Sequence, residues 1–399
     1  MELINKNFSM LLAGQLVSQV GDKFHMIAIS FWVLETTGSS GKMGMVLAAS
    51  LIPSLILGFF SGTFIDRYPR KNIIVGTDLL RGIILGCFAV LFIAGRMDFY
   101  LILILQVILS VNAAFFDPAI PSVIPQIVNQ EQLARANAIH QFVNGFAMIA
   151  GAMLGGIFVA ALGYLWVFIL NGISFLLSAF FEAFITIPHI KVEKKNSLVS
   201  DMKQGYHYLF QNQMLMVLLF MVMIIHFFVG SIEVFMPVIA DKISGNGPKT
   251  LGFFQAAFGG GTIAMAFALS LVSASGKEKI SLFSSTFFIG MVFVASFWIQ
   301  GDEVTMTGLF IFCLFLMGCA IILASISFKT LLQKNLDNSY SGRIFALAGS
   351  IGNASIPGAM ILYGVLLDRF HYQGLLLGSG LVLMVLSLIS FVLYKEEQS

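Results

Sequence analysis

The stretch Gly62-Thr63-Phe64-Ile65-Asp66-Arg67-Tyr68-Pro69-Arg70-Lys71 separates two long apolar runs in the first quarter of the chain. Both runs are long enough to cross the hydrocarbon core of a bilayer as helices. The charges between them predict a short loop at the membrane surface. Gly62 permits close approach of a neighbouring helix, and Asp66 is suited to capping a helix N-terminus or pairing with an arginine.

Composition extends this membrane interpretation to the whole chain of 399 residues. Hydrophobic residues make up 58%, charged residues 11%, and the mean hydropathy is +0.92. Soluble domains carry about 25% charged residues, so a soluble protein is excluded. A net charge of +2 gives no reason to expect nucleic acid as a partner.

The sequence also lacks the motifs that would indicate an enzyme or a metalloprotein. It contains no phosphate-binding loop, no Ser/His/Asp arrangement on one loop and no cluster with metal-ligand spacing. The three cysteines, Cys87, Cys313 and Cys319, lie singly in apolar runs and predict neither a disulfide framework nor a metal site. We therefore expect no enzymatic activity, no metal and no cofactor.

Apolar segments recur along the whole chain and predict an all-α polytopic membrane protein. Helices are expected because lipid cannot satisfy open strands, and no alternating barrel pattern is present. Twelve spans are predicted, at 8–35, 43–65, 72–95, 98–124, 137–162, 164–187, 214–240, 250–273, 280–300, 305–330, 341–367 and 372–394.

Basic residues predict the orientation of these spans. With the N-terminus inside, 15 lysines and arginines face the cytoplasm and 5 face outward, as the positive-inside rule requires. We expect both termini to be cytoplasmic, in a multi-pass protein of the bacterial cytoplasmic membrane. The first apolar run continues past Asp22 without a cleavage site, which favours a retained span over a signal peptide.

A hydrophilic stretch at 188–213 divides the chain into two halves, 1–187 and 214–399. It predicts a cytoplasmic linker, within which 198–210 has the composition of an amphipathic surface helix. The halves show weak internal similarity, such as Arg135-Ala136-Asn137 opening the fifth span and Gly342-Arg343-Ile344 opening the eleventh. We expect two pseudo-symmetric six-helix bundles around a central site.

The loop from Gly62 to Lys71 resembles the signature of the major facilitator superfamily, Gly-x-x-x-Asp-Arg-x-Gly-Arg-Lys/Arg. Gly62, Asp66, Arg67, Arg70 and Lys71 match it, and Pro69 replaces the usual glycine. The resemblance implies a gate that breaks when the cytoplasmic side opens; the alternative is an ordinary basic loop.

A second stretch, Gly151-Ala152-Met153-Leu154-Gly155-Gly156, resembles the Gly-Pro-x-x-Gly-Gly motif of the antiporter branch, with Ala152 in place of proline. Gly151, Gly155 and Gly156 predict a flat face for tight helix packing. Gly21-Asp22, Asp78-Leu79-Leu80-Arg81 and Phe116-Asp117-Pro118 resemble the macrolide-efflux and siderophore-exporter type of drug antiporter. That resemblance implies export but does not identify the substrate.

Three acids within the predicted spans are candidates for coupling transport to protons: Asp22, then Glu233, then Asp117. Ionisable groups in hydrocarbon are costly and usually face the bundle interior, and a carboxyl group removed from water can exchange protons near neutral pH. Alternatively, Asp22 pairs with Lys23, Asp117 caps or gates, and Glu233 is solvated near the outer surface.

Polar side chains at helical spacing suggest the lining of a substrate cavity. These candidates are Gln15, Ser18, Gln106, Ser110, His140, Asn144 and His226. Their alternative role, strongest for the two histidines, is packing within the bundle. Asp78 and Arg81, three residues apart, are expected to pair as a structural network, and Glu182 is expected at the membrane interface.

These features favour a monomeric secondary transporter that uses the proton gradient to export amphipathic drugs or small hydrophobic metabolites, a function that would confer antibiotic resistance. Its partners are then the small substrate, protons and the lipid bilayer. The alternatives on the same fold are a lipid or lysolipid flippase and an exporter of one specific metabolite. A sensor or scaffold is disfavoured because no soluble signalling domain is present.

Overall fold

A computed structural model describes residues 5–187, 212–271, 276–336 and 341–394. Within these ranges every regular element is a helix, and no strand is formed. Eleven helices are long and apolar enough to cross a membrane. The prediction of an all-α polytopic membrane protein is therefore confirmed.

The chain divides into two compact units, residues 1–193 with 245–256 and residues 194–244 with 257–399. Residues 245–256 group with the first unit, and the predicted halves, 1–187 and 214–399, stay a prediction. The predicted linker at 188–213, with its amphipathic segment at 198–210, lies outside the described residues apart from Asn212 and Gln213.

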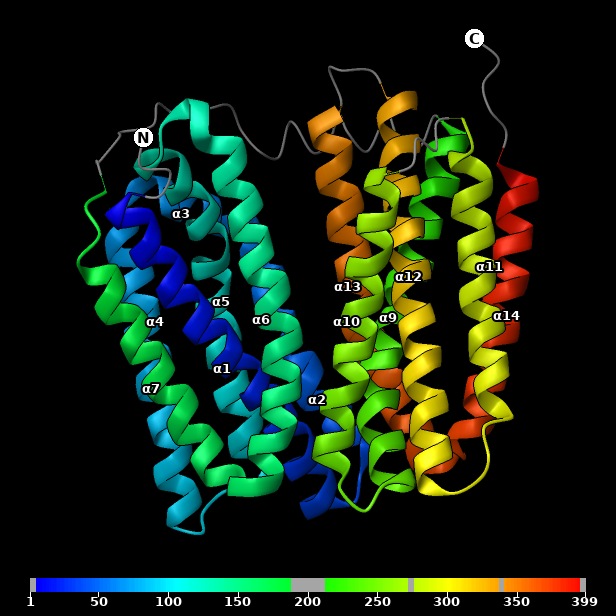
Figure 1. Cartoon of the computed structure of the whole chain (residues 1–399), viewed down its shortest axis with the longest axis horizontal. Coiled ribbons are helices and arrows are strands. Elements are labelled where there is room, and N and C mark those ends of the chain that lie inside the picture. The colour runs from blue at the N-terminus through cyan, green and yellow to red at the C-terminus, as the bar shows by residue number, and fades with distance from the viewer. Residues whose placement is uncertain (1–4, 188–211, 272–275, 337–340, 395–399) are drawn as a thin grey trace. The chain divides into compact units, whose positions relative to one another are not determined.

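The first unit is a bundle in which α1, α4 and α7 run side by side, as Figure 1 shows. Its elements are α1 (Lys6–Thr37), α2 (Ser40–Ala49), α3 (Ile52–Arg67), α4 (Arg70–Ile93), α5 (Phe99–Ile127), the short 3-10 helix η1 (Gln130–Gln132), α6 (Leu133–Leu162) and α7 (Tyr164–Ala183). Helix α7 packs on α1 along one side and on α4 along the other.

The second unit is also a bundle of long helices, in which α9 packs on α13 and α11 packs on α12 and α14. Its elements are α9 (Gln213–Ile243), the part of α10 (Gly247–Leu271) beyond residue 256, α11 (Glu278–Phe297), α12 (Glu303–Asn335), α13 (Ser341–Arg369) and α14 (Tyr372–Leu393).

Helix α1 is the most polar of the long helices. It extends over 32 residues, yet it is absent from the eleven apolar spans. Gln15, Gln19, Asp22, Lys23 and His25 lower its hydropathy, which concentrates polar chemistry on one element. With α2 and α3 counted as one span, α1 is the twelfth helix of membrane-crossing length.

The predicted second span is not one continuous helix, because it breaks between α2 and α3 at Ser50 and Leu51. Pro53 lies in the first turn of α3 and has no N–H to donate to the preceding turn. The backbone N–H of Ser54 instead donates to Ser110 Oγ of α5 at 3.1 Å. Side-chain acceptors of this kind let a proline break persist within a membrane.

Helices α6 and α7 are joined by a single residue, Gly163, which ends one helix and begins the other. Its φ of +78° lies in the region that glycine adopts without a Cβ penalty. The glycine therefore makes a reversal possible with no further loop residues.

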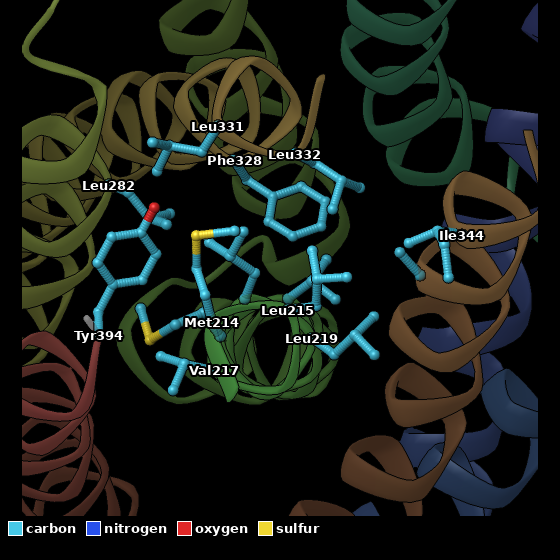
Figure 2. Packing of buried hydrophobic residues seen from close by; sticks show 14 of the residues in the cluster. Met214, Leu215, Val217, Leu219, Leu282, Phe328, Leu331, Leu332, Ile344 and Tyr394 are labelled. Carbon is cyan, nitrogen blue, oxygen red and sulfur yellow. The ribbon is translucent and has the colours of Figure 1, made fainter. Parts of the chain in front are cut away.

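Each unit has its own buried apolar cluster near one end of its helices. In the first unit the cluster draws on α1, α4, α5 and the residues after α7. In the second unit, Figure 2 shows α9 side chains such as Met214 and Leu215 facing α12 side chains such as Phe328 and Leu332. Tyr394, directly after α14, packs in the same cluster.

Candidate functional site

Arg81, on α4, is the centre of a polar site inside the first unit. Its side chain is only 8% exposed. Its Nε–H donates to Asn112 Oδ1 at 3.0 Å, and Asn112 Nδ2 donates in turn to the backbone oxygen of Thr77 at 3.0 Å. The guanidinium also lies 4.7 Å from the centre of the Phe116 ring and 5.1 Å from that of Phe175. Such rings stabilise a cation removed from water.

Two predicted proton-coupling acids meet at this arginine. Asp22 Oδ2 lies 3.9 Å from Nη1 of Arg81, and Asp117 Oδ1 lies 3.9 Å from Nη2. Both distances are too long for hydrogen bonds but short enough for ion pairing. The carboxyl side chains are 48% and 70% exposed, so both are reachable from outside the bundle.

Two further acids near Arg81 are fully enclosed. Asp78 and Glu182 are 0% exposed. Among the described residues, none of their four carboxyl oxygens has a hydrogen-bond partner. Glu182 is thus enclosed within the bundle, and the Asp78 carboxyl accepts no hydrogen bond from Arg81, although the guanidinium acts on it electrostatically. Arg81 points to Asp22 and Asp117 instead.

The burial of Glu182 follows from a stripe of polar residues on α7. Asn171, Ser174, Ser178 and Glu182 recur every three or four residues, and all are buried. The stripe faces α1, where a Cβ added at Gly21 would collide with Asn171 and Ser174. The three- and four-residue spacing of these polar residues is present in the sequence and would have revealed the buried polar face of α7.

Glu233, the third predicted acid, lies on α9 in the second unit and is partly buried. Its proposed part in proton coupling stays a prediction.

Several predicted cavity residues form pairs between helices. His140 Nε2 of α6 lies 2.8 Å from Gln15 Oε1 of α1, and Gln19 Nε2 donates to Asn144 Oδ1 of α6 at 2.9 Å. Gln106 Oε1 of α5 lies 3.1 Å from Nε2 of His25. His25 is buried and was not singled out by the sequence analysis.

The other predicted cavity residues bond mainly to backbone. Ser18 is buried and donates to the Gln15 oxygen of its own helix at 3.3 Å. Ser110 accepts the Ser54 amide at the break described above. His226 Nδ1 lies 2.8 Å from the Val222 oxygen within α9. Whether any of these residues touches a substrate stays a prediction.

The loop between α3 and α4 is short, as predicted. Only Tyr68 and Pro69 separate the two helices. Arg70 Nη1 donates to the backbone oxygen of Ser122 on α5 at 2.7 Å, and Lys71 is partly buried. The side chains of Asp66 and Arg67, and the surroundings of Gly62, lie outside the description. The gating role of this loop stays a prediction.

The glycine face of α6 packs against α1. A Cβ added at Gly151 would lie 2.9 Å from Lys23 Cβ, and one at Gly155 would lie 3.0 Å from Phe24 Cα. A Cβ at Gly156 would meet the start of α10, 3.2 Å from Gly252 Cα within the same compact unit. All three glycines therefore lie at close helix contacts.

The second unit contains a cavity of about 780 Å³. Apolar side chains of α10, α11, α12 and α14 line most of it, including Met265, Phe287, Met291 and Leu323. Three serine hydroxyls and one thiol also line it, those of Ser284, Ser285, Ser387 and Cys319. Its walls suit an alkyl chain or an apolar ring.

Long apolar helices with buried charges at their centre define a polytopic membrane transporter rather than an enzyme. A family model described as Major Facilitator Superfamily matches residues 11–360. The chain belongs to the major facilitator superfamily.

Known proteins similar to the chain include exporters. Macrolide efflux protein A of Streptococcus pyogenes is 24% identical over 387 residues, covering 96% of this chain and 94% of that protein. The putative bacilysin exporter BacE of Bacillus amyloliquefaciens is 24% identical over 376 residues, covering 91% and 89%. The crystal structure of the nucleoside transporter NupG aligns with a TM-score of 0.77 at 14% identity, covering 100% of both chains, which supports the fold.

Proposed function

We propose that this transporter exports small amphipathic compounds from the bacterial cytoplasm in exchange for protons, by alternating access. The site around Arg81 is the observation that carries the proposal. Two exposed carboxylates each lie 3.9 Å from one buried guanidinium, and Lys23 also acts on Asp22. The similarity to efflux and exporter proteins supports the outward direction of transport.

The proposed mechanism follows from the ion pairs. Ionised Asp22 and Asp117 hold Arg81 between α1 and α5. A proton bound at either carboxyl removes a negative charge and weakens that helix contact. A cationic or polar substrate competes with the proton for the same carboxylates, so one species leaves as the other binds. The proton gradient then supplies the energy, without a cofactor.

The proposal also includes the orientation of the chain and the membrane in which it lies. The bias of 15 basic residues to 5 supports cytoplasmic termini, and the bacterial relatives support placement in the cytoplasmic membrane. One chain contains the whole Arg81 site, which supports function as a monomer. If the exported compounds include antibiotics, the transporter would confer resistance to them.

The test uses inside-out membrane vesicles with an acidic lumen and a panel of fluorescent amphipathic dyes. The intact protein should accumulate a dye in the lumen and release luminal protons. Asp22→Asn and Asp117→Asn should abolish proton-driven accumulation at unchanged protein levels. Asp98→Asn is the matched control, because asparagine can still cap α5 at this exposed position. Proton-driven accumulation retained by both site variants would refute the mechanism.

The apolar cavity in the second unit favours one second candidate, translocation of a lipid or lysolipid. Its walls match an acyl chain better than a charged drug. Proteoliposomes containing labelled lysolipid separate the two functions. Movement of lysolipid between leaflets without a proton gradient, and no movement of any dye, would favour translocation.

A further inference from the structure

We propose that Asp78 of α4 and Glu182 of α7 form a second proton-holding site, enclosed behind the exposed carboxylates and linked to them through Arg81. The inference deepens the proposed function and rests on it for the proton's part in transport. The sequence analysis assigned neither residue a role in proton exchange.

The packing of α4 on α7 isolates this pair from water. Both side chains are 0% exposed. Four residues beyond Asp78, at Gly82, an added Cβ would lie 2.7 Å from Leu176 Cδ2 and 3.2 Å from the Gly172 oxygen. The helices therefore touch at backbone distance beside the pair. A proton can reach it only through neighbouring polar groups or after the helices separate.

The number of charges requires that some of these acids be neutral. Arg81 acts on Asp78, Glu182, Asp22 and Asp117. Four ionised carboxylates beside Arg81 and Lys23 would still leave a net negative charge in a medium of low dielectric constant. Protonation of a carboxylate lowers this negative charge. Asp78 and Glu182 have the least access to water, so they are the acids we expect to be protonated.

The other charged groups on the packed helices act on residues other than Asp78 and Glu182. On α1, Lys23 acts on Asp22, and His25 bonds to Gln106. On α6, His140 bonds to Gln15. The groups that act on Asp78 itself are Arg81, Ser178 and Asp22.

The lack of hydrogen-bond partners also indicates that Asp78 and Glu182 are neutral. Buried carboxylates normally accept several hydrogen bonds, because an ionised oxygen without them is very costly. Here the oxygens of Asp78 and Glu182 have no partner within hydrogen-bond distance among the described residues; Ser178 acts on Asp78, and Asn171 on Asp22, from beyond that distance. A neutral pair tolerates this arrangement. Ser178, one turn before Glu182 on α7, is placed to donate to a carboxylate once a proton leaves.

Arg81 links the exposed acids, Asp22 and Asp117, to the enclosed acids, Asp78 and Glu182. In this structure it pairs with Asp22 and Asp117. In the proposed cycle, Asp78 and Glu182 hold the protons at this stage. When a proton from the outer side forms an O–H bond at Asp22 or Asp117, the guanidinium loses an ion pair. It then turns to a carboxylate left at Asp78 or Glu182 as one O–H bond breaks, and the proton passes to water once α4 and α7 separate at the pair. The number of ionised acids beside Arg81 stays constant.

The first experiment measures protonation without transport. Infrared spectra of the purified protein should contain carbonyl bands of protonated carboxyl groups, and part of this intensity should disappear as pH rises. Glu182→Gln and Asp78→Asn should each remove part of the titrating intensity, whereas Glu131→Gln, at an exposed position of η1, should not. Glu182→Asp keeps a titratable group and should retain a shifted band.

The second experiment measures coupling in inside-out vesicles. Glu182→Gln and Asp78→Asn should lose proton-driven dye accumulation but retain dye exchange down a dye gradient, and Glu182→Asp should restore part of the accumulation. Wild-type coupling in both neutral variants, or infrared bands that do not respond to pH, would overturn the proposal. If the intact protein shows a titrating pair but no proton-coupled transport, the proposed function fails and the proton-holding site stands.

Discussion

Asn112 provides the most direct measure of how firmly the buried arginine is held. Replacing it in Asn112→Ala removes the acceptor of the Arg81 Nε–H and the donor to the Thr77 oxygen, both at 3.0 Å. Asn112 is itself buried. The cationic donor would then be left in a low-dielectric interior with no replacement acceptor, because the two ion-paired carboxylates face other nitrogens.

The expected cost follows from the two lost bonds. A hydrogen bond to a charged group contributes about 1.5–3 kcal/mol. The bond to the Thr77 oxygen adds only about 0.6 kcal/mol, the average for interhelical bonds measured in a membrane protein. We expect Asn112→Ala to lower the free energy of unfolding by about 2.1–3.6 kcal/mol, roughly a 35- to 400-fold change in the unfolding equilibrium.

The assay is equilibrium unfolding in mixed micelles, followed by circular dichroism. Asn129→Ala is the matched control, since Asn129 is exposed before η1 and its side chain makes no capping bond. The control should stay within about 0.5 kcal/mol of the intact protein. An equally small effect of Asn112→Ala would refute the reasoning, because Arg81 would then be held without this bond.

Two further predictions concern packing and capping. Gly155→Val should weaken folding by about 1–3 kcal/mol, because its side chain would press on the Phe24 backbone, whereas Gly86→Ala meets nothing within 4 Å and should be neutral or stabilising in the same unfolding assay. The pKa of Asp302 lies below its usual value, because the Thr305 hydroxyl and backbone N–H donate to the carboxylate that caps α12. Its stabilising effect is therefore present above the unfolded pKa and lost as pH falls through the folded pKa. Asp302→Ala should lower the melting temperature at neutral pH and have less effect in acid; an equal loss at both would contradict this origin.

The membrane spans were predictable because hydropathy is a local property. Each apolar run must cross the bilayer as a helix, whatever it packs against. The break at Ser50 and Leu51 was missed, although Pro53 marks it, because many membrane helices tolerate proline. Whether this proline breaks the span depends on Ser110, which is distant in sequence.

The candidate site was only partly predictable. Asp22 and Asp117 were identified because an acid in an apolar run is conspicuous by itself. Their common partner Arg81 was assigned to Asp78, since neighbours within one helix are the only pairs that a single sequence reveals. The burial of Glu182 depends on how α7 faces α1 and α4, and only the polar stripe on α7 indicated it in advance.

The one-residue turn at Gly163 also restricts experimental design. An epitope tag or protease site inserted there would strain both α6 and α7, so a negative accessibility result would be uninterpretable. The turn between α4 and α5 is a better location for a reporter. Arg96 and Met97 lie there between helix ends, and Asp98 caps the helix that follows. A cysteine label at Arg96 would thus report which side of the membrane this turn faces without disturbing the site.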